Sequence, residues 1–125
     1  MDDDVSLPDF LPLWGADLVG SSSRRHDFTQ VFADHQNNAD GQARLEEYLN
    51  DSFAHTLRLV ERAKDEGHVD PEISTAAVAL ALQTVEVGVH MIRSGGLDED
   101  LIPPTSDWIA CIERYFGGVR PLPAD

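Results

Sequence analysis

The chain has 125 residues, of which 42% are hydrophobic and 26% are charged, a composition typical of one soluble globular domain spanning residues 1–125. Its 23 acidic residues outnumber 9 basic ones, and the formal net charge is −14. Because this charge repels phosphate, we expect the chain alone to bind neither nucleic acid nor an anionic membrane. No apolar run approaches the roughly 18 residues of a membrane span, the acidic start does not resemble a signal peptide, and the single Cys111 excludes an internal disulfide. These features favour a cytoplasmic protein.

The spacing of apolar residues predicts helices throughout and no strand, so the expected fold class is all-α. We expect five helices, near residues 8–19, 24–36, 42–66, 72–93 and 107–116. The stretch from Asn37 to Gly41 has turn chemistry, and Gly67 supplies a helix stop. Pro12 is expected to weaken the first helix if it falls beyond the first turn.

The 72–93 helix is the stretch around which we expect the rest of the chain to be organised. Its polar residues form one narrow stripe of Gln83, Glu86, His90 and Arg93, and we expect His90 to be solvated there. Its apolar residues form two faces, one of Ile73, Ala76, Leu80, Thr84, Val87 and Met91 and the other of Val78, Leu82, Val85, Val89 and Ile92. A surface helix usually has a single apolar stripe. This helix therefore needs cover on two sides, which its own domain and a second copy could provide.

We accordingly predict a symmetric homodimer in which the 72–93 and 107–116 helices of both chains form a four-helix bundle. The residues expected at this interface are Val78, Leu82, Val85, Val89, Ile92, Trp108, Ile112 and Tyr115. The opposite assignment, with the Ile73 face toward the partner, is the alternative.

The order of segments resembles one known family. LVERAKDEGHVDPEIS, then AAVALALQTVEVGVHM, then a loop and DWIACIERYF resemble the C-terminal regulatory domain of TetR-family transcription factors, over residues 7–118. The resemblance implies dimerisation through the last two long helices, a small and often apolar ligand, and an N-terminal helix-turn-helix domain that binds an operator. No basic three-helix segment precedes residue 7. We therefore expect an excised regulatory fragment, or alternatively a natural relative without DNA binding.

Motifs for catalysis or metal binding are not found in the sequence. No two histidines have the i,i+4 spacing of a helical zinc site, there is no HExxH, and no glycine loop is suited to phosphate. Cys111 lies between apolar residues without a basic neighbour to activate it. We expect no metal, no cofactor and no enzymatic activity.

Aromatic and Met residues on inward faces, together with a few polar groups, predict a small-molecule pocket inside each protomer. It is expected between the 8–36 helix pair, the 42–66 helix and the 72–93 helix. The predicted walls are Trp14, Leu18, Phe28, Phe32, Leu49, Phe53 and Met91, with His35, Thr56 and Thr84 as polar groups. The expected function is a ligand-sensing, dimerising domain of a transcriptional repressor. The alternatives are a stand-alone helical interaction module without ligand and, third, an enzyme acting on an apolar substrate.

Overall fold

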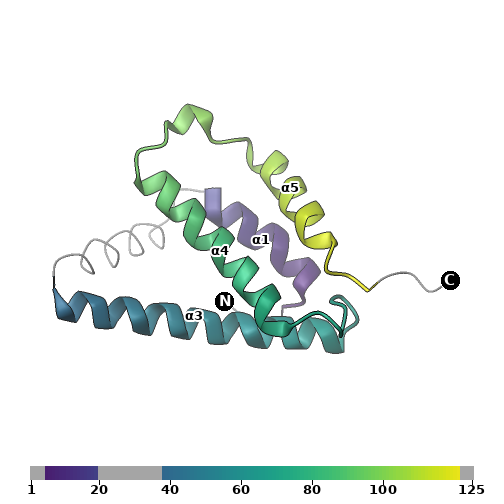
Figure 1. The fold of residues 1–125 in the computed structure, drawn as a ribbon. Helices are drawn as coiled ribbons and strands as arrows, with labels where there is room; N and C mark the ends of the chain where they lie inside the picture. Colours follow the sequence, from purple (N-terminus) through teal and green to yellow (C-terminus); the bar gives the residue numbers. More distant parts are fainter. Residues whose placement is uncertain (1–4, 20–37, 122–125) are drawn as a thin grey trace.

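The computed structural model describes residues 5–19 and 38–121 (Figure 1). In chain order the elements are α1 (Leu7–Val19), α3 (Ala39–Asp65), α4 (Thr75–Ser94), the short 3-10 helix η1 (Glu99–Leu101) and α5 (Thr105–Gly117). No strand occurs in these two described ranges, which confirms the all-α class. The predicted helix at 24–36 lies outside them.

The helix at the centre of the described fold is α1. It packs mainly against α5 and also against α3 and α4, while the principal partner of α3 is α4. Figure 1 shows α1 between α4 and α5. Its buried residues follow a helical spacing and are Leu7, Phe10, Leu11, Trp14, Gly15 and Leu18. The helix that contacts all the other long helices is therefore α1, and not the 72–93 helix that the sequence pattern predicted as the central one.

Aromatic contacts connect α1 to α5. The Trp14 ring stacks on Phe10, with centroids 5.6 Å apart, and meets the edge of Phe116 at 6.0 Å. All three side chains are buried in the main core, which also contains Leu18 and Val60. Burying one large apolar side chain contributes about 1.5–3 kcal/mol. This cluster is thus a principal source of stability for the fold.

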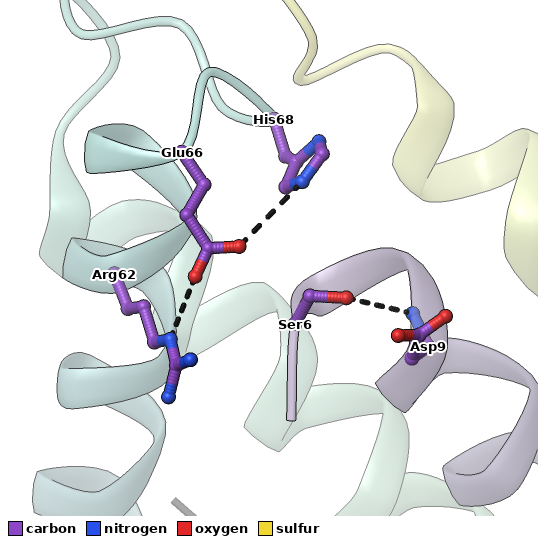
Figure 2. Close-up of polar contacts among 5 residues, drawn as sticks. All are labelled: Ser6, Asp9, Arg62, Glu66 and His68. Carbon is purple, nitrogen blue, oxygen red and sulfur yellow. Dashed lines mark hydrogen bonds and ion pairs between the residues drawn. The ribbon is translucent and has the colours of Figure 1, made fainter. Parts of the chain in front are cut away.

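The start of α1 is capped by Ser6. Its backbone oxygen accepts from the Phe10 amide at 2.8 Å, and its Oγ lies 3.4 Å from the Asp9 amide nitrogen (Figure 2). Pro12 lies beyond the first turn, yet the helix continues through it. The hydrogen bond that Pro12 cannot donate is a local cost, which the burial of the surrounding apolar residues offsets.

The boundaries of α3 depend on its caps. It begins three residues before the predicted start because the Asn38 Oδ1 accepts from the Gly41 amide at 2.6 Å, so that this segment is a helix start and not a turn. The helix ends before Gly67, whose φ of 82° is a left-handed conformation suited to glycine. Near this end the Arg62 Nε donates to Glu66 at 2.6 Å, and His68 lies 3.7 Å from the same carboxylate (Figure 2).

The start of α4 falls three residues after the predicted one. Asp70 and Ser74 are both residue types suited to cap this helix, and Ser74 is the one used: its Oγ accepts from the Ala77 amide at 3.2 Å. Asp70 instead accepts from the Glu72 amide within the preceding turn, at 2.9 Å. The Asp70 amide also donates to the Val119 oxygen at 2.8 Å, which ties this connector to the segment after α5.

The predicted loop before the last helix contains η1. Its start is capped by Asp98, which accepts from the Asp100 amide at 3.0 Å. α5 then begins at Thr105, two residues before the predicted start, without a side-chain cap. The Pro104 oxygen accepts from the Trp108 amide at 3.1 Å and so closes the first turn.

Candidate ligand-binding groove

The polar stripe of α4 faces the protein interior. Gln83 is 9% exposed, Glu86 is buried and His90 is 1% exposed. The Arg93 side chain is 5% exposed. The prediction that His90 is solvated is therefore wrong.

Two hydrogen bonds explain why the stripe turns inward. The Gln83 Nε2 donates to the Leu49 oxygen in α3 at 3.3 Å, and the Arg93 Nη1 donates to the Leu18 oxygen in α1 at 3.0 Å. Polar groups can be buried when they find such partners. Helical periodicity aligns the four polar residues but does not decide which side of α4 faces the core.

With the polar stripe inside, α4 presents apolar residues to solvent. Leu80, Met91 and Ile92 are all exposed large hydrophobic side chains. Thr84 is also exposed and lies on the same helix. The outward side of α4 therefore lacks the charged residues usual for a solvated helix face.

A groove of about 620 Å³, open to solvent, lies between α3 and α4. It is lined by Leu49, Asn50 and Phe53 of α3 and by Leu80, Gln83, Thr84, Val87, Gly88 and Met91 of α4. The α4 residues recur at three- and four-residue intervals and so form one helix face. The volume is in the range of small-molecule sites, about 300–1,000 Å³, and the few polar groups among apolar walls fit that class.

The polar side chains of the groove are held by backbone oxygens of their own helices or of the neighbouring one. The Thr84 hydroxyl donates to the Leu80 oxygen at 2.7 Å. The Asn50 Nδ2 donates to the Glu46 oxygen at 2.8 Å. Gln83, the third polar residue, bonds across to α3 as described above. Each of the three thus donates to the protein and still offers an oxygen acceptor.

Gly88 leaves open space on the groove wall. A Cβ atom built at this position would have no heavy atom within 4 Å. Its φ is not positive, so a side chain would meet no backbone strain either. A larger residue at this position would project into the groove rather than into the core.

Four of the ten predicted ligand-binding residues line this groove, namely Leu49, Phe53, Thr84 and Met91. The prediction did not include the other five lining residues, Asn50, Leu80, Gln83, Val87 and Gly88. Leu80 and Val87 share the apolar face on which Thr84 and Met91 were placed, so the spacing alone could have included them. The spacing of apolar residues could not have predicted Gln83 as a groove residue, because Gln83 belongs to the polar stripe.

The remaining predicted pocket residues lie elsewhere. Trp14 and Thr56 line a separate cavity of about 30 Å³ between α1, α3 and α4, which has room for little more than a water molecule. Leu18 is fully buried in the core and does not line the groove. The other three, Phe28, Phe32 and His35, lie outside the described residues.

The predicted interface residues divide into three groups. Val78, Leu82 and Ile112 are buried in the core of their own protomer, so they offer little surface to a partner. A second group is partly buried against that core and consists of Val85, Val89 and Trp108. Ile92 and Tyr115 are exposed. Since α5 packs mainly on α1 and not on α4, the predicted pairing of the last two helices stays a prediction.

Two further observations concern the chemistry and hydropathy of the described part. No group of three or more His, Cys, Asp and Glu side chains in residues 5–19 and 38–121 could hold a metal ion. One segment, Thr75–Arg93 in α4, is long and apolar enough to cross a membrane by length and composition. Core helices of soluble proteins pass the same test, and 33% of this window is buried within the described structure.

Comparisons with models of known families, with characterised proteins and with solved structures give no match. The fold and the groove together therefore define a class of architecture: an all-α bundle with an open, mainly apolar groove between two of its helices. Membership of the TetR family stays a hypothesis based on the sequence patterns.

Proposed function

We propose that this chain is the ligand-sensing and dimerising regulatory domain of a TetR-type transcriptional repressor, acting in the cytoplasm. The observation that supports this most is the groove between α3 and α4, which contains four residues predicted to bind a ligand. The regulatory role in this proposal rests on the resemblance to the family. The small-molecule site in this proposal rests on the groove.

The groove suits an apolar ligand because its walls are apolar and adaptable. Leu49 and Phe53 offer apolar surface from α3, and Leu80 and Met91 offer it from α4. The unbranched Met91 side chain can adjust to ligands of different shape. A ligand in contact with both helices would stabilise their packing. It would thereby act on α4, the helix whose exposed Ile92 is predicted to contact a partner chain.

In this proposal the DNA-reading part belongs to a separate helix-turn-helix domain. The net charge of −14 opposes DNA binding by the chain itself. A basic helix-turn-helix encoded directly upstream would support the proposal. Continuous coding sequence there without one would favour a module that does not regulate transcription.

The groove is tested by a thermal-shift screen of uncharged hydrophobic compounds. A ligand that binds only the folded chain raises the melting temperature by mass action. We expect hits with the natural chain and with Gly117→Phe, and none of the same hits with Gly88→Phe. The Gly88 substitution projects a ring into the groove, whereas Gly117 lies in α5, and both positions have open space for a Cβ. Equal shifts in all three proteins would refute binding in this groove.

A second candidate is a stand-alone helical interaction module without ligand. It is favoured by the exposed apolar side chains of Leu80, Met91 and Ile92 on one helix, which a protein partner could cover. The same screen separates the candidates. A dimeric chain that no apolar compound stabilises would support the module.

A further inference from the structure

We propose that the groove selects apolar molecules carrying a hydrogen-bond donor, such as a hydroxyl or an amine, over apolar acids of the same shape. This inference rests on the proposed function, namely that the groove binds a small molecule. It concerns the chemistry by which the groove would distinguish one such molecule from another.

The first observation is that the polar side chains of the groove present acceptors. The single hydroxyl proton of Thr84 is used for the bond to the Leu80 oxygen, so only lone pairs of Oγ1 remain for a ligand. The Asn50 amide donates one of its two N–H groups to the Glu46 oxygen, and its Oδ1 remains an acceptor beside the second N–H. A ligand group that meets these atoms is favoured if it donates.

The second observation is the buried oxygen of Gln83. The Nε2 must face the Leu49 oxygen, because a carbonyl oxygen can only accept and the reversed amide would place two oxygens together. This orientation leaves the Gln83 Oε1, which is inaccessible to solvent and accepts no hydrogen bond within the described chain. The residue itself is 9% exposed. Leaving such a group unsatisfied is unfavourable, and a donor from a ligand would correct it.

Gln83 is placed so that a ligand can use this oxygen. Both Gln83 and Leu49 line the groove, so the amide that joins them lies along the contact between α3 and α4. The terminal torsion of a glutamine is broad, so a small rotation adjusts the position of the Oε1 without moving either helix, whereas a large one would break the bond from Nε2 to the Leu49 oxygen. A donor group on a ligand between Phe53 and Thr84 would therefore find an acceptor that has no other partner among the described residues.

The third observation is the charge around the groove. Within residues 5–19 and 38–121, no Lys, Arg, Asp or Glu lines the groove. A carboxylate in the groove would lose its hydration without gaining a cation, and it would do so on a chain of net charge −14. Binding of an apolar acid is therefore disfavoured both by the lost hydration of its carboxylate and by the negative charge of the chain.

The test uses three probes with one ring system: naphthalenemethanol, ethylnaphthalene and naphthoate. Their dissociation constants are measured by calorimetry for the natural chain, for Gln83→Met and for the control Gln42→Met, an exposed position of α3 outside the groove. We expect the preference for the alcohol over ethylnaphthalene to fall on the order of tenfold in Gln83→Met and to be unchanged in Gln42→Met. We expect naphthoate to bind most weakly to the natural chain.

The outcomes separate this inference from the function on which it rests. If ethylnaphthalene binds the natural chain and not Gly88→Phe, while the preference for alcohol is the same with and without Gln83, the groove is a ligand site and the donor inference is overturned. Binding of naphthoate as tight as that of the alcohol would also overturn it. If no probe binds the natural chain, the proposed function fails, and the inference fails with it.

Discussion

The Arg93 guanidinium of α4 donates a hydrogen bond of 3.0 Å to the main-chain oxygen of Leu18 in α1, across 75 positions of the sequence. The Arg93 side chain is 5% exposed, and its Nη2 lies 3.3 Å from Glu99 in η1. Carbonyl oxygens at the end of a helix lack intrahelical partners, and a cation is favoured there. One nearly buried side chain thus joins the end of α1 to α4 and η1.

Replacing this arginine tests its contribution to the fold. Arg93→Met keeps the aliphatic length but removes the donors, so we expect the free energy of unfolding to fall by about 1–3 kcal/mol. Urea denaturation gives the value. Glu99→Gln is the control, since Glu99 is 68% exposed and a pair of this kind contributes at most about 1 kcal/mol. An equal, small effect of both changes would contradict the role of Arg93.

The burial of His90 leads to a second prediction. His90→Ala removes a side chain that is 1% exposed and should lower the free energy of unfolding by about 2–4 kcal/mol through cavity formation and lost interactions. The matched change Leu80→Ala removes an exposed side chain of the same helix and should cost less than about 1 kcal/mol. Urea denaturation compares the two. A smaller effect at His90 than at Leu80 would show that α4 is turned the other way.

The fold could be predicted from the sequence where one face of a helix was clearly apolar. α1 was located to within one residue because its apolar positions from Phe10 to Leu18 have helical spacing and fill the core. The starts of α3 and α4 differ from the predicted ones because each is set by a single capping side chain. Asn38 caps α3 and Ser74 caps α4.

The orientation of α4 could not be predicted, because both an apolar and a polar side of the helix can face inward. The decision depends on long-range partners, the Leu49 oxygen for Gln83 and the Leu18 oxygen for Arg93, which local periodicity does not contain. The site was predicted only in part for the same reason. Phe53 and Met91 do line a groove, but one on the outer side of the α3–α4 contact, while Trp14 packs in the core with α5.

Two glycines should respond to alanine in opposite directions. Gly88→Ala lies within a helix, meets open space and should raise the free energy of unfolding by about 0.5–1 kcal/mol. Gly67→Ala also meets open space, but its φ of 82° makes a side chain unfavourable by about 1–2 kcal/mol. Thermal unfolding should show a raised midpoint for the first and a lowered one for the second. The same sign for both would contradict the backbone conformations described.

The homodimer is tested by changing an exposed residue of the predicted interface. Ile92 is 58% exposed, so Ile92→Glu should leave the fold intact and convert a dimer into monomers. Leu101→Glu is the control, because Leu101 is also exposed, at 69%, but belongs to η1, outside the predicted interface. Sedimentation velocity at micromolar concentration measures the state of each protein. A monomeric natural chain would refute the dimer, and a dimeric Ile92→Glu would place the contact elsewhere.

The most direct measurement of ligand binding in the groove is the signal of the Met91 methyl group. The sequence has only 2 methionines, so isotope labelling of their methyl groups gives a simple spectrum, in which Met91→Leu identifies the Met91 signal. Because Met91 lines the groove, titration with ethylnaphthalene should shift this signal until it saturates, and the shift should vanish in Gly88→Phe. A Met91 signal that does not move, at concentrations where ethylnaphthalene raises the melting temperature, would show that the ligand binds elsewhere and would contradict the assignment of this groove.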